Sequence, residues 1–337
     1  NERSQRGFIP TVRNVYMEDV TCQKSKYGIL LNGLEDQDRI YGIHVKRCTF
    51  NGVTDHPYRH TGLSHDIHFD SLVVNGQTIL AQRPFVHYSE WMTHSEMQRE
   101  PHPAYLDFTD RAKRPDGKWS YVMGIELEAM LDAYLAHGDS SIFNYVKRYP
   151  DKMIAPNGDI TGYKLEDYNL DNVRTAHFLY RLFQLYPFAG GETALNTLFR
   201  QLEEQPRTKQ GVWWHKAIYA HQVWLDGIFM GLPYYTLSAE QLRGKKVANR
   251  VYEDAIMQIT STFQRTFDAS TGLWKHAWDE THSIFWANSQ TGLSRHTWAR
   301  ALGWFTMAMV EVLDALPAEH PKRPELIRMF RQTMDAV

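Results

Sequence analysis

The chain has only two cysteines among its 337 residues, Cys22 and Cys48, too few for a disulfide framework and without metal-site spacing. No apolar run is long enough to cross a membrane, so no membrane insertion is expected. The formal net charge of −2 gives no electrostatic reason to expect nucleic acid as a partner. The first residues lack the apolar centre of a signal peptide, and both ends look cut, so localisation and oligomeric state stay open.

Residues 1–82 show a repeat of alternating apolar positions. Val12, Val15, Met17 and Val20 recur 28 residues later as Ile40, Ile43, Val45 and Cys48, and a third copy follows at Ile67, Phe69 and Leu72. Asn14, Gly42 and Asp66 take the same turn-like place in each copy. Repeats of about 20 to 30 residues with this alternation are typical of stacked coils, as in a parallel β-helix. We therefore expect a short parallel β-helix, with Cys48 as an inward core residue.

Residues 83–337 change to a helical apolar period, as at Leu127, Met130, Leu131 and Tyr134. Helices are predicted at 86–99, 119–137, 140–150, 168–186, 191–205, 219–236, 244–267, 295–316 and 321–337. No strand pattern alternates with them, so this domain is predicted to be all-α.

Two loops between these helices share the sequence pattern Gly-apolar-Trp-any-His. They span residues 211–215 and 272–276. Such an echo favours repeated helical hairpins in an (α/α) barrel, with a site where the loops gather. Chance similarity of two short loops is the alternative.

Asp226 is the most informative residue, because an aspartate in an apolar helix is expected to be either paired or functional. Burial would raise its pKa and suit it to donate a proton to a sugar. Gly227 beside it weakens the helix, which is tolerable if something approaches the backbone closely. Ten tryptophans offer faces for sugar rings, although most aromatic side chains are simply core. A capping or paired aspartate in a helical core is the plainer reading.

Six segments of the helical part together resemble a known family. They are Lys118 to Tyr121 with Gly124, Tyr168 to Asn172, His215-Lys216, Trp224 to Gly227, Gly272 to His276, and Trp298 to Trp304. In this order and spacing, the part after residue 82 resembles the unsaturated rhamnogalacturonyl hydrolases of glycoside hydrolase family 105, relatives of the unsaturated glucuronyl hydrolases. The resemblance implies an (α/α)6 barrel, here apparently without its last helices, and a bacterial periplasmic or cytoplasmic location. Residues 1–82 look similar to the last coils of polygalacturonase-type pectinases of family 28, without their catalytic motifs.

The resemblance implies an oligosaccharide substrate that ends in a 4,5-unsaturated galacturonic acid, cleaved by hydration of the C4=C5 bond. Asp226 then donates the proton, and Asp171 stands across the cavity and raises the pKa of Asp226. Capping of its own helix is the plain alternative for Asp171. The family's sugar-binding residues fall on Arg300, His276, His215, Lys216, Trp224, Trp298 and Trp304. Without the resemblance, Arg300 would be expected in a surface ion pair, the histidines in loops with their hydrogen bonds satisfied, and the tryptophans in the core.

No metal or other cofactor is expected. His65 and His68 lie near each other, but strand alternation predicts opposite faces for them. The helical part has no His-Glu-x-x-His pattern. Two other functions stay open: an inverting glycosidase that uses Asp226 and Asp171 on saturated oligosaccharides, and a catalytically silent sugar-binding scaffold.

Overall fold

The computed structural model describes residues 9–79, 87–107 and 114–337. The chain divides into two compact units, Asn1–Met92 and Thr93–Val337, and each is described by itself. The domain boundary predicted at residue 82 lies outside the described residues.

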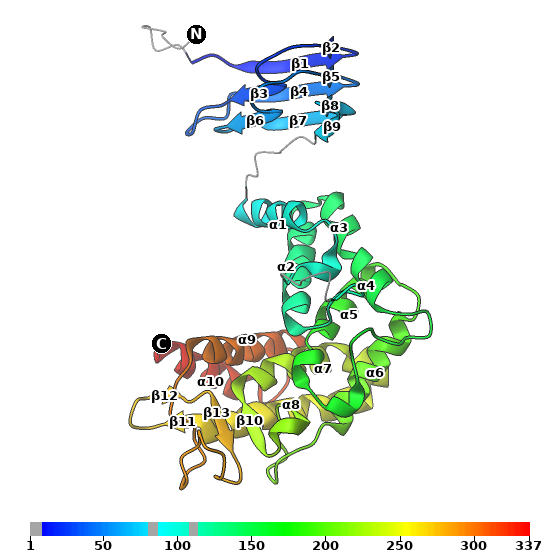
Figure 1. Cartoon of the computed structure of the whole chain (residues 1–337). Helices are drawn as coiled ribbons and strands as arrows, with labels where there is room; N and C mark the ends of the chain where they lie inside the picture. The colour runs from blue at the N-terminus through cyan, green and yellow to red at the C-terminus, as the bar shows by residue number, and fades with distance from the viewer. Residues whose placement is uncertain (1–8, 80–86, 108–113) are drawn as a thin grey trace. The chain divides into compact units, whose positions relative to one another are not determined.

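The first unit is a stack of coils built from parallel strands (Figure 1). Its strands are β1 (Val12–Glu18), β2 (Thr21–Cys22), β3 (Ile29–Asn32), β4 (Ile40–Lys46), β5 (Thr49–Phe50), β6 (Tyr58–Thr61), β7 (His65–Asp70), β8 (Leu72–Val74) and β9 (Gln77–Ile79). They form sheets in the orders β1-β4-β7, β2-β5-β8-β9 and β3-β6, parallel except for β8 with β9. Val12 pairs with Ile40, so the register follows the offset of the sequence repeat.

Asn14, Gly42 and Asp66 share a left-handed backbone, with φ of 55°, 67° and 55°. They occupy the same place in β1, β4 and β7, so the turn-like position of the repeat is a kink within each strand. Asparagine, aspartate and glycine tolerate this conformation best. Cys48 is fully buried in the apolar core of the coils, as expected.

The prediction that His65 and His68 lie on opposite faces is wrong. Both side chains are 51% exposed, whereas Ile67 between them is buried. The left-handed residue Asp66 shifts the alternation by one position, because a strand alternates only while its backbone stays extended. His65 lies 2.6 Å from Asp38, and His68 lies 2.6 Å from Asp66.

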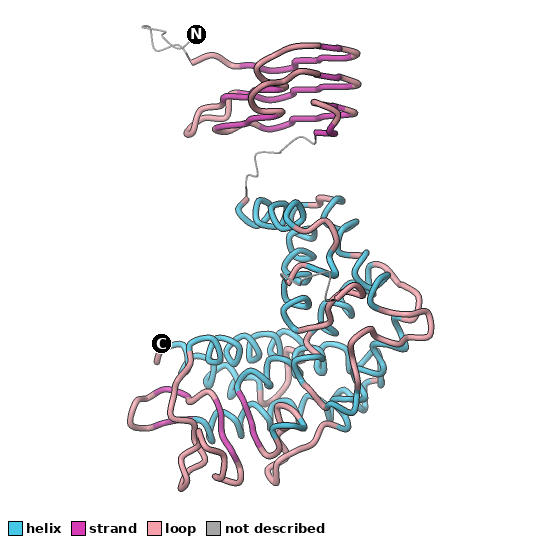
Figure 2. Tube along the Cα trace, viewed as in Figure 1, coloured by secondary structure: helices cyan, strands magenta, loops and turns pink. Residues whose placement is uncertain are grey.

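The second unit is mainly helical (Figure 2). Its α-helices, with the helix that leads into it, are α1 (Tyr88–Arg99), α2 (Tyr121–His137), α3 (Ser140–Val146), α4 (Arg148–Met153), α5 (Thr175–Leu185), α6 (Gly191–Glu204), α7 (Leu225–Arg243), α8 (Lys245–Thr266), α9 (Ala299–Ala315) and α10 (Arg323–Asp335). Among the described residues they are accompanied by the 3-10 turns η1 (Pro103–Tyr105), η2 (Leu165–Asp167), η3 (Leu170–Asn172) and η4 (Ala217–Tyr219).

The helices form two layers. Helices α2, α5, α7 and α9 contact one another in chain order, and each also contacts the helix that follows it, α3, α6, α8 or α10. Helix α7 is the most central, because almost every residue from Leu225 to Ala239 is buried. This alternation of inner and outer helices is the layering of an α/α barrel.

Four sequence expectations for this unit need correction. The segment 140–150 forms two short helices, because α3 ends at Val146 and α4 begins at Arg148. Helix 168–186 begins only at Thr175, and helix 219–236 begins at Leu225. The unit also holds the short strands β10 (Gln222–Trp224), β11 (Phe267–Asp268), β12 (Leu273–Trp274) and β13 (Ala277–Asp279) in its loops. Strands of two or three residues are too short to show alternation, so the sequence did not reveal them.

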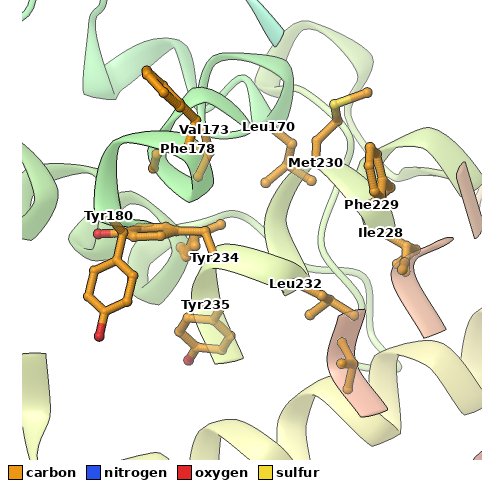
Figure 3. Close-up of a cluster of buried hydrophobic side chains, with 14 of the residues drawn as sticks. Leu170, Val173, Phe178, Tyr180, Ile228, Phe229, Met230, Leu232, Tyr234 and Tyr235 are labelled. Atoms are coloured by element: carbon orange, nitrogen blue, oxygen red, sulfur yellow. The ribbon is translucent and has the colours of Figure 1, made fainter. Parts of the chain in front are cut away.

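The core between α5 and α7 positions the site. Figure 3 shows Leu170, Val173 and Phe178 in one buried cluster with Phe229 and Met230 of α7. All are buried, so the segment around Leu170 is fixed against α7 by apolar packing. In the described part of the chain, every helix falls short of the length and hydropathy that a bilayer crossing requires.

Candidate active site

Asp226 lies in the first turn of α7, not inside the helix as expected. Trp224 precedes the helix in an extended conformation, with φ of −116° and ψ of 142°, and closes the strand β10. The Asp226 side chain is only 9% exposed. Its Oδ2 atom is buried and has no hydrogen-bond partner among the described residues. An acid in this setting keeps one oxygen available for a proton.

Burial raises the pKa of the Asp226 carboxyl above its usual value, because dehydration disfavours the charged form. Arg300 opposes this shift, since its Nη2 atom lies 3.8 Å from Asp226 Oδ1. The negative charge of Asp171 adds a smaller upward contribution to the pKa. The expected influence of Asp171 is thus present, but desolvation is the main cause.

Asp171 sits on the 3-10 turn η3 and does not open helix α5, which begins four residues later. The backbone amide of Asp171 donates to Asn169 Oδ1 at 3.1 Å, so Asn169 caps this turn. The Asp171 carboxylate lies 2.5 Å from Lys216 Nζ and 3.4 Å from His215 Nε2. Asp171 is therefore held as a charged partner of Lys216.

His215 is a buried ring beside Asp171. It stacks on Trp224, with ring centres 4.9 Å apart, and burial lowers the pKa of His215 to about 4. Its Nδ1 atom lies 2.9 Å from the place where a Cβ at Gly227 would sit. The close approach expected at Gly227 is thus made by the imidazole of His215, which fits only because residue 227 has no side chain.

The repeated loops place their histidines equivalently. The carbonyl of His215 accepts a hydrogen bond from the amide of Leu170 at 3.1 Å, and the carbonyl of His276 accepts one from Leu225 at 3.0 Å. Leu170 directly precedes Asp171, and Leu225 directly precedes Asp226. The similarity of the two loops therefore reflects one backbone arrangement used twice.

Three successive hairpins present their site residue at the same position. Asn169, Trp224 and Trp298 are each extended N-cap residues. Asp171, Asp226 and Arg300 follow each cap by two residues. Two carboxylates and a guanidinium thus start from matching points on η3, α7 and α9.

Aromatic rings surround this group. Trp224 lies parallel to Tyr219, with ring centres 5.3 Å apart, and edge-on to Trp286 at 6.5 Å. Trp298 is 42% exposed and carries the guanidinium of Arg300 over its face at 3.8 Å. Tyr219 and Trp286 were not among the site residues predicted from the sequence. Only their place in loops rich in aromatic residues, beside motifs already singled out, could have indicated them.

His276 and Trp304 have different surroundings. His276 Nδ1 lies 2.7 Å from Ser294 Oγ, and its ring lies edge-on to Trp298 at 6.1 Å, so it borders the aromatic group. Trp304 instead stacks on Phe229 at 4.8 Å, one helical turn beyond Arg300. Trp304 therefore packs against the core behind the first turn of α7.

The described residues contain no group of three or more histidine, cysteine, aspartate or glutamate side chains that could hold a metal ion. A hollow of about 830 Å³ lies along α10, and another of about 500 Å³ lies between α9 and the end of α10. Neither hollow is lined by Asp226, Asp171 or Arg300. Neither brings a buried acid together with aromatic rings, as the residues around Asp226 do.

Paired helices in two layers thus carry a buried acid, a second carboxylate and a guanidinium at matching helix starts, with aromatic rings beside them. The family model described as Glycosyl Hydrolase Family 88 matches residues 88–337, and the chain belongs to this family.

Among curated relatives, Protein Atu3128 of Agrobacterium fabrum and the 24.9 kDa protein in the picA locus of Rhizobium radiobacter are each 40% identical over 88 residues. That match covers 26% of this chain and 36% of each relative, so the chain spans about a third of their length.

Two solved structures share the fold. A family 105 glycoside hydrolase of C. acetobutylicum is 33% identical, with a TM-score of 0.67, and the match covers 74% of this chain and 65% of that one. A possible family 105 member of Klebsiella pneumoniae is 20% identical, with a TM-score of 0.56, covering 77% of this chain and 68% of that one. The second likeness concerns the fold alone.

Proposed function

We propose that this chain removes an unsaturated uronic acid from the non-reducing end of an oligosaccharide, by hydration of its C4=C5 bond. The observation that carries the proposal is the state of Asp226: buried, raised in pKa, and with one oxygen unpartnered. Membership of Glycosyl Hydrolase Family 88 supports the reaction class.

In the proposed reaction, Asp226 donates its proton to C4, and the positive charge at C5 is shared with the ring oxygen. Water adds at C5, and the Asp226 carboxylate takes up the proton that the water loses. The resulting hemiketal opens and releases the neighbouring sugar. One water is consumed, and Asp226 returns to its protonated form. Asp171 pairs with Lys216, and it contributes to raising the pKa of Asp226.

Arg300 is the proposed partner of the uronate carboxylate. Its side chain is 48% exposed and lies over Trp298, so its forked donors can reach a second carboxylate while it stays near Asp226. Lys216, His215 and His276 are proposed to contact the same sugar, with Trp224 and Trp298 as apolar walls. Trp304 supports Phe229 from behind, which makes it an indirect contributor. We further propose a pectin-derived rhamnogalacturonan oligosaccharide as substrate, on the sequence resemblance.

The test mixes the protein with lyase-generated oligosaccharides and follows the ultraviolet absorbance of the conjugated C4=C5 bond. Wild-type protein should remove the absorbance, and Asp226→Asn should abolish its decay. Asp151→Asn, at an exposed position on α4, is the matched control and should keep full activity. Steady absorbance with folded wild-type protein would reject the proposal.

Two other measurements separate the alternatives. An inverting glycosidase would instead release reducing ends from saturated oligosaccharides, and a silent scaffold would bind saccharide in calorimetry without turnover. For the first unit we propose that it descends from a polygalacturonase-type β-helix and that it has itself no cleavage activity. Release of reducing ends from polygalacturonate by the whole chain would contradict that proposal.

A further inference from the structure

Arg174 is a buried cation that the proposed reaction does not use. It lies between η3 and α5 and is 3% exposed. Its Nη2 atom donates to Glu128 Oε2 of α2 at 2.6 Å, and its Nη1 atom donates to Glu311 Oε2 of α9 at 2.9 Å. One guanidinium therefore connects the start of α5 with two other inner helices.

The flat face of the same guanidinium reaches a third inner helix. Arg174 lies over the Phe229 ring of α7 at 4.1 Å, and Phe229 in turn stacks on Trp304 of α9 at 4.8 Å with the planes only 9° apart. The three side chains form a continuous stack across α5, α7 and α9. A guanidinium suits this place because it can donate at its edge and stack on its face, which an ammonium group cannot do.

Each member of the stack lies about one helical turn beyond a residue of the acid site. Arg174 follows Asp171 by three residues, Phe229 follows Asp226 by three, and Trp304 follows Arg300 by four. In α7 and α9, residues at these spacings share a face of the helix, and Arg174 lies at the junction of η3 and α5, just beyond Asp171. The stack therefore forms a layer behind the two carboxylates and Arg300, and it joins the same three segments that carry them.

We propose that Arg174 is a positioning residue, which fixes the starts of η3, α7 and α9 so that Asp171, Asp226 and Arg300 keep their mutual geometry. This proposal rests on the proposed function of that site. Arg174 itself touches neither Asp226 nor a sugar; it acts through Phe229 and Trp304.

The charges around Arg174 are compensated, so the network is built to stay buried. Burial opposes the ionisation of Glu128, but hydrogen bonds from His177 and Arg181 and the charge of Arg174 outweigh it and hold the pKa of Glu128 at about 2. Arg181 also pairs with Asp132 toward the outside of the network. A buried arginine with two carboxylate partners is costly to remove but tolerates a charge-preserving change better.

The experiment compares Arg174→Lys with Arg181→Lys. Both variants keep a cation beside Glu128, but only Arg174 lies over Phe229. We expect Arg174→Lys to lower kcat about 10- to 100-fold with KM changed less than about threefold, because displacement of about 1 Å at a reacting group has this order of effect. Arg181→Lys should stay within about threefold of wild type in kcat.

A second variant tests the route through the stack. Phe229→Leu should lower kcat in the same direction, and the double variant Arg174→Lys with Phe229→Leu should be no slower than the slower single variant by more than about twofold. If the kcat losses of the two single variants instead multiplied in the double variant, the proposed route through Phe229 would be overturned. Equal kcat losses in Arg174→Lys and Arg181→Lys would overturn the positioning role, because both would then report general stability.

Hydrogen exchange makes the inference independent of turnover. In Arg174→Lys, amide exchange should rise in residues 170–172, 225–228 and 299–302, whereas Arg181→Lys should raise it only near α5 and α2. If wild-type protein shows no activity, the proposed function fails, but this exchange pattern still tests the coupling of the three segments. A rise confined to α5 in Arg174→Lys would refute that coupling.

Discussion

Gly227→Ala separates helix propensity from the packing of the site. Gly227 lies in the first turn of α7, next to Asp226. A methyl group there would meet His215 Nδ1 at 2.9 Å and Leu170 Cδ1 at 3.2 Å. His215 has little room to withdraw, because its ring stacks on Trp224 and its Nε2 atom lies 3.4 Å from Asp171. The substitution therefore acts on both aspartates through one methyl group.

The two opposing contributions can be compared in magnitude. Alanine in place of glycine inside a helix stabilises by about 1 kcal/mol. Forcing a methyl group into a packed core typically costs about 1–3 kcal/mol. Because the contact at 2.9 Å is to a stacked, buried ring, we expect the larger cost to prevail. The free energy of unfolding should fall by about 1 kcal/mol, and kcat should fall about tenfold or more as His215 and Asp171 shift.

Gly303→Ala is the matched control. Gly303 also lies in the first turns of an inner helix, α9, but a Cβ there would meet no atom within 4 Å. It should gain up to about 1 kcal/mol from propensity alone. Denaturant titrations followed by tryptophan fluorescence measure both variants, because all ten tryptophans lie at or beyond residue 91 and report on the helices. If Gly227→Ala stabilised the protein as much as Gly303→Ala and kept full activity, the tight fit of His215 would be refuted.

Three further predictions concern other parts of the chain. In the folded protein the pKa of His215 is about 4, below its unfolded value of about 6.5. The unfolded chain therefore binds a proton first, and the free energy of unfolding falls as pH is lowered from about 6.5 to about 4. His215→Gln should flatten this pH dependence, as measured by denaturant titrations at several pH values. Asp279 accepts hydrogen bonds from the amides of Thr281, Ser283 and Ile284. Asp279→Ala should therefore lower the free energy of unfolding by about 2 kcal/mol and raise KM, because the loop that carries Trp286 loosens. An unchanged KM would contradict the link between this loop and the substrate. A thiol reagent should label Cys22 in the native protein and Cys48 only after unfolding, because Cys48 is fully buried.

The parts of the fold with strong periodicity were predictable. The coil register follows from apolar residues that recur at a fixed offset, because stacked coils must align their inward positions. Most helices match their predicted ranges within a few residues, since their ends carry glycine or a capping side chain, as at Gly138 and Asp139. The orientation of His65 and His68 was not predictable, because it depends on the left-handed backbone of one residue, Asp66.

The site was predictable in its residues but not in its environment. Asp226, Asp171, His215 and Arg300 come together, and all are part of motifs visible in the sequence. That Lys216 pairs with Asp171 could not be read from spacing, because the partners come from segments 45 residues apart in the chain. The layer of Arg174, Phe229 and Trp304 could not be predicted either, because its members come from distant segments and each alone looks like an ordinary helix or core residue.

The matching positions of Asp171, Asp226 and Arg300 have a consequence for how such a scaffold can vary. The backbones that carry Asp171 and Asp226 are secured by the loop carbonyls of His215 and His276, and Arg300 lies in the first turn of α9, whose helical backbone does not depend on its charge. Exchanging one of these three side chains would alter the acidity or the anion affinity of the centre while leaving the supporting hydrogen bonds in place. A fold assembled from repeated hairpins can thus acquire new chemistry one hairpin at a time.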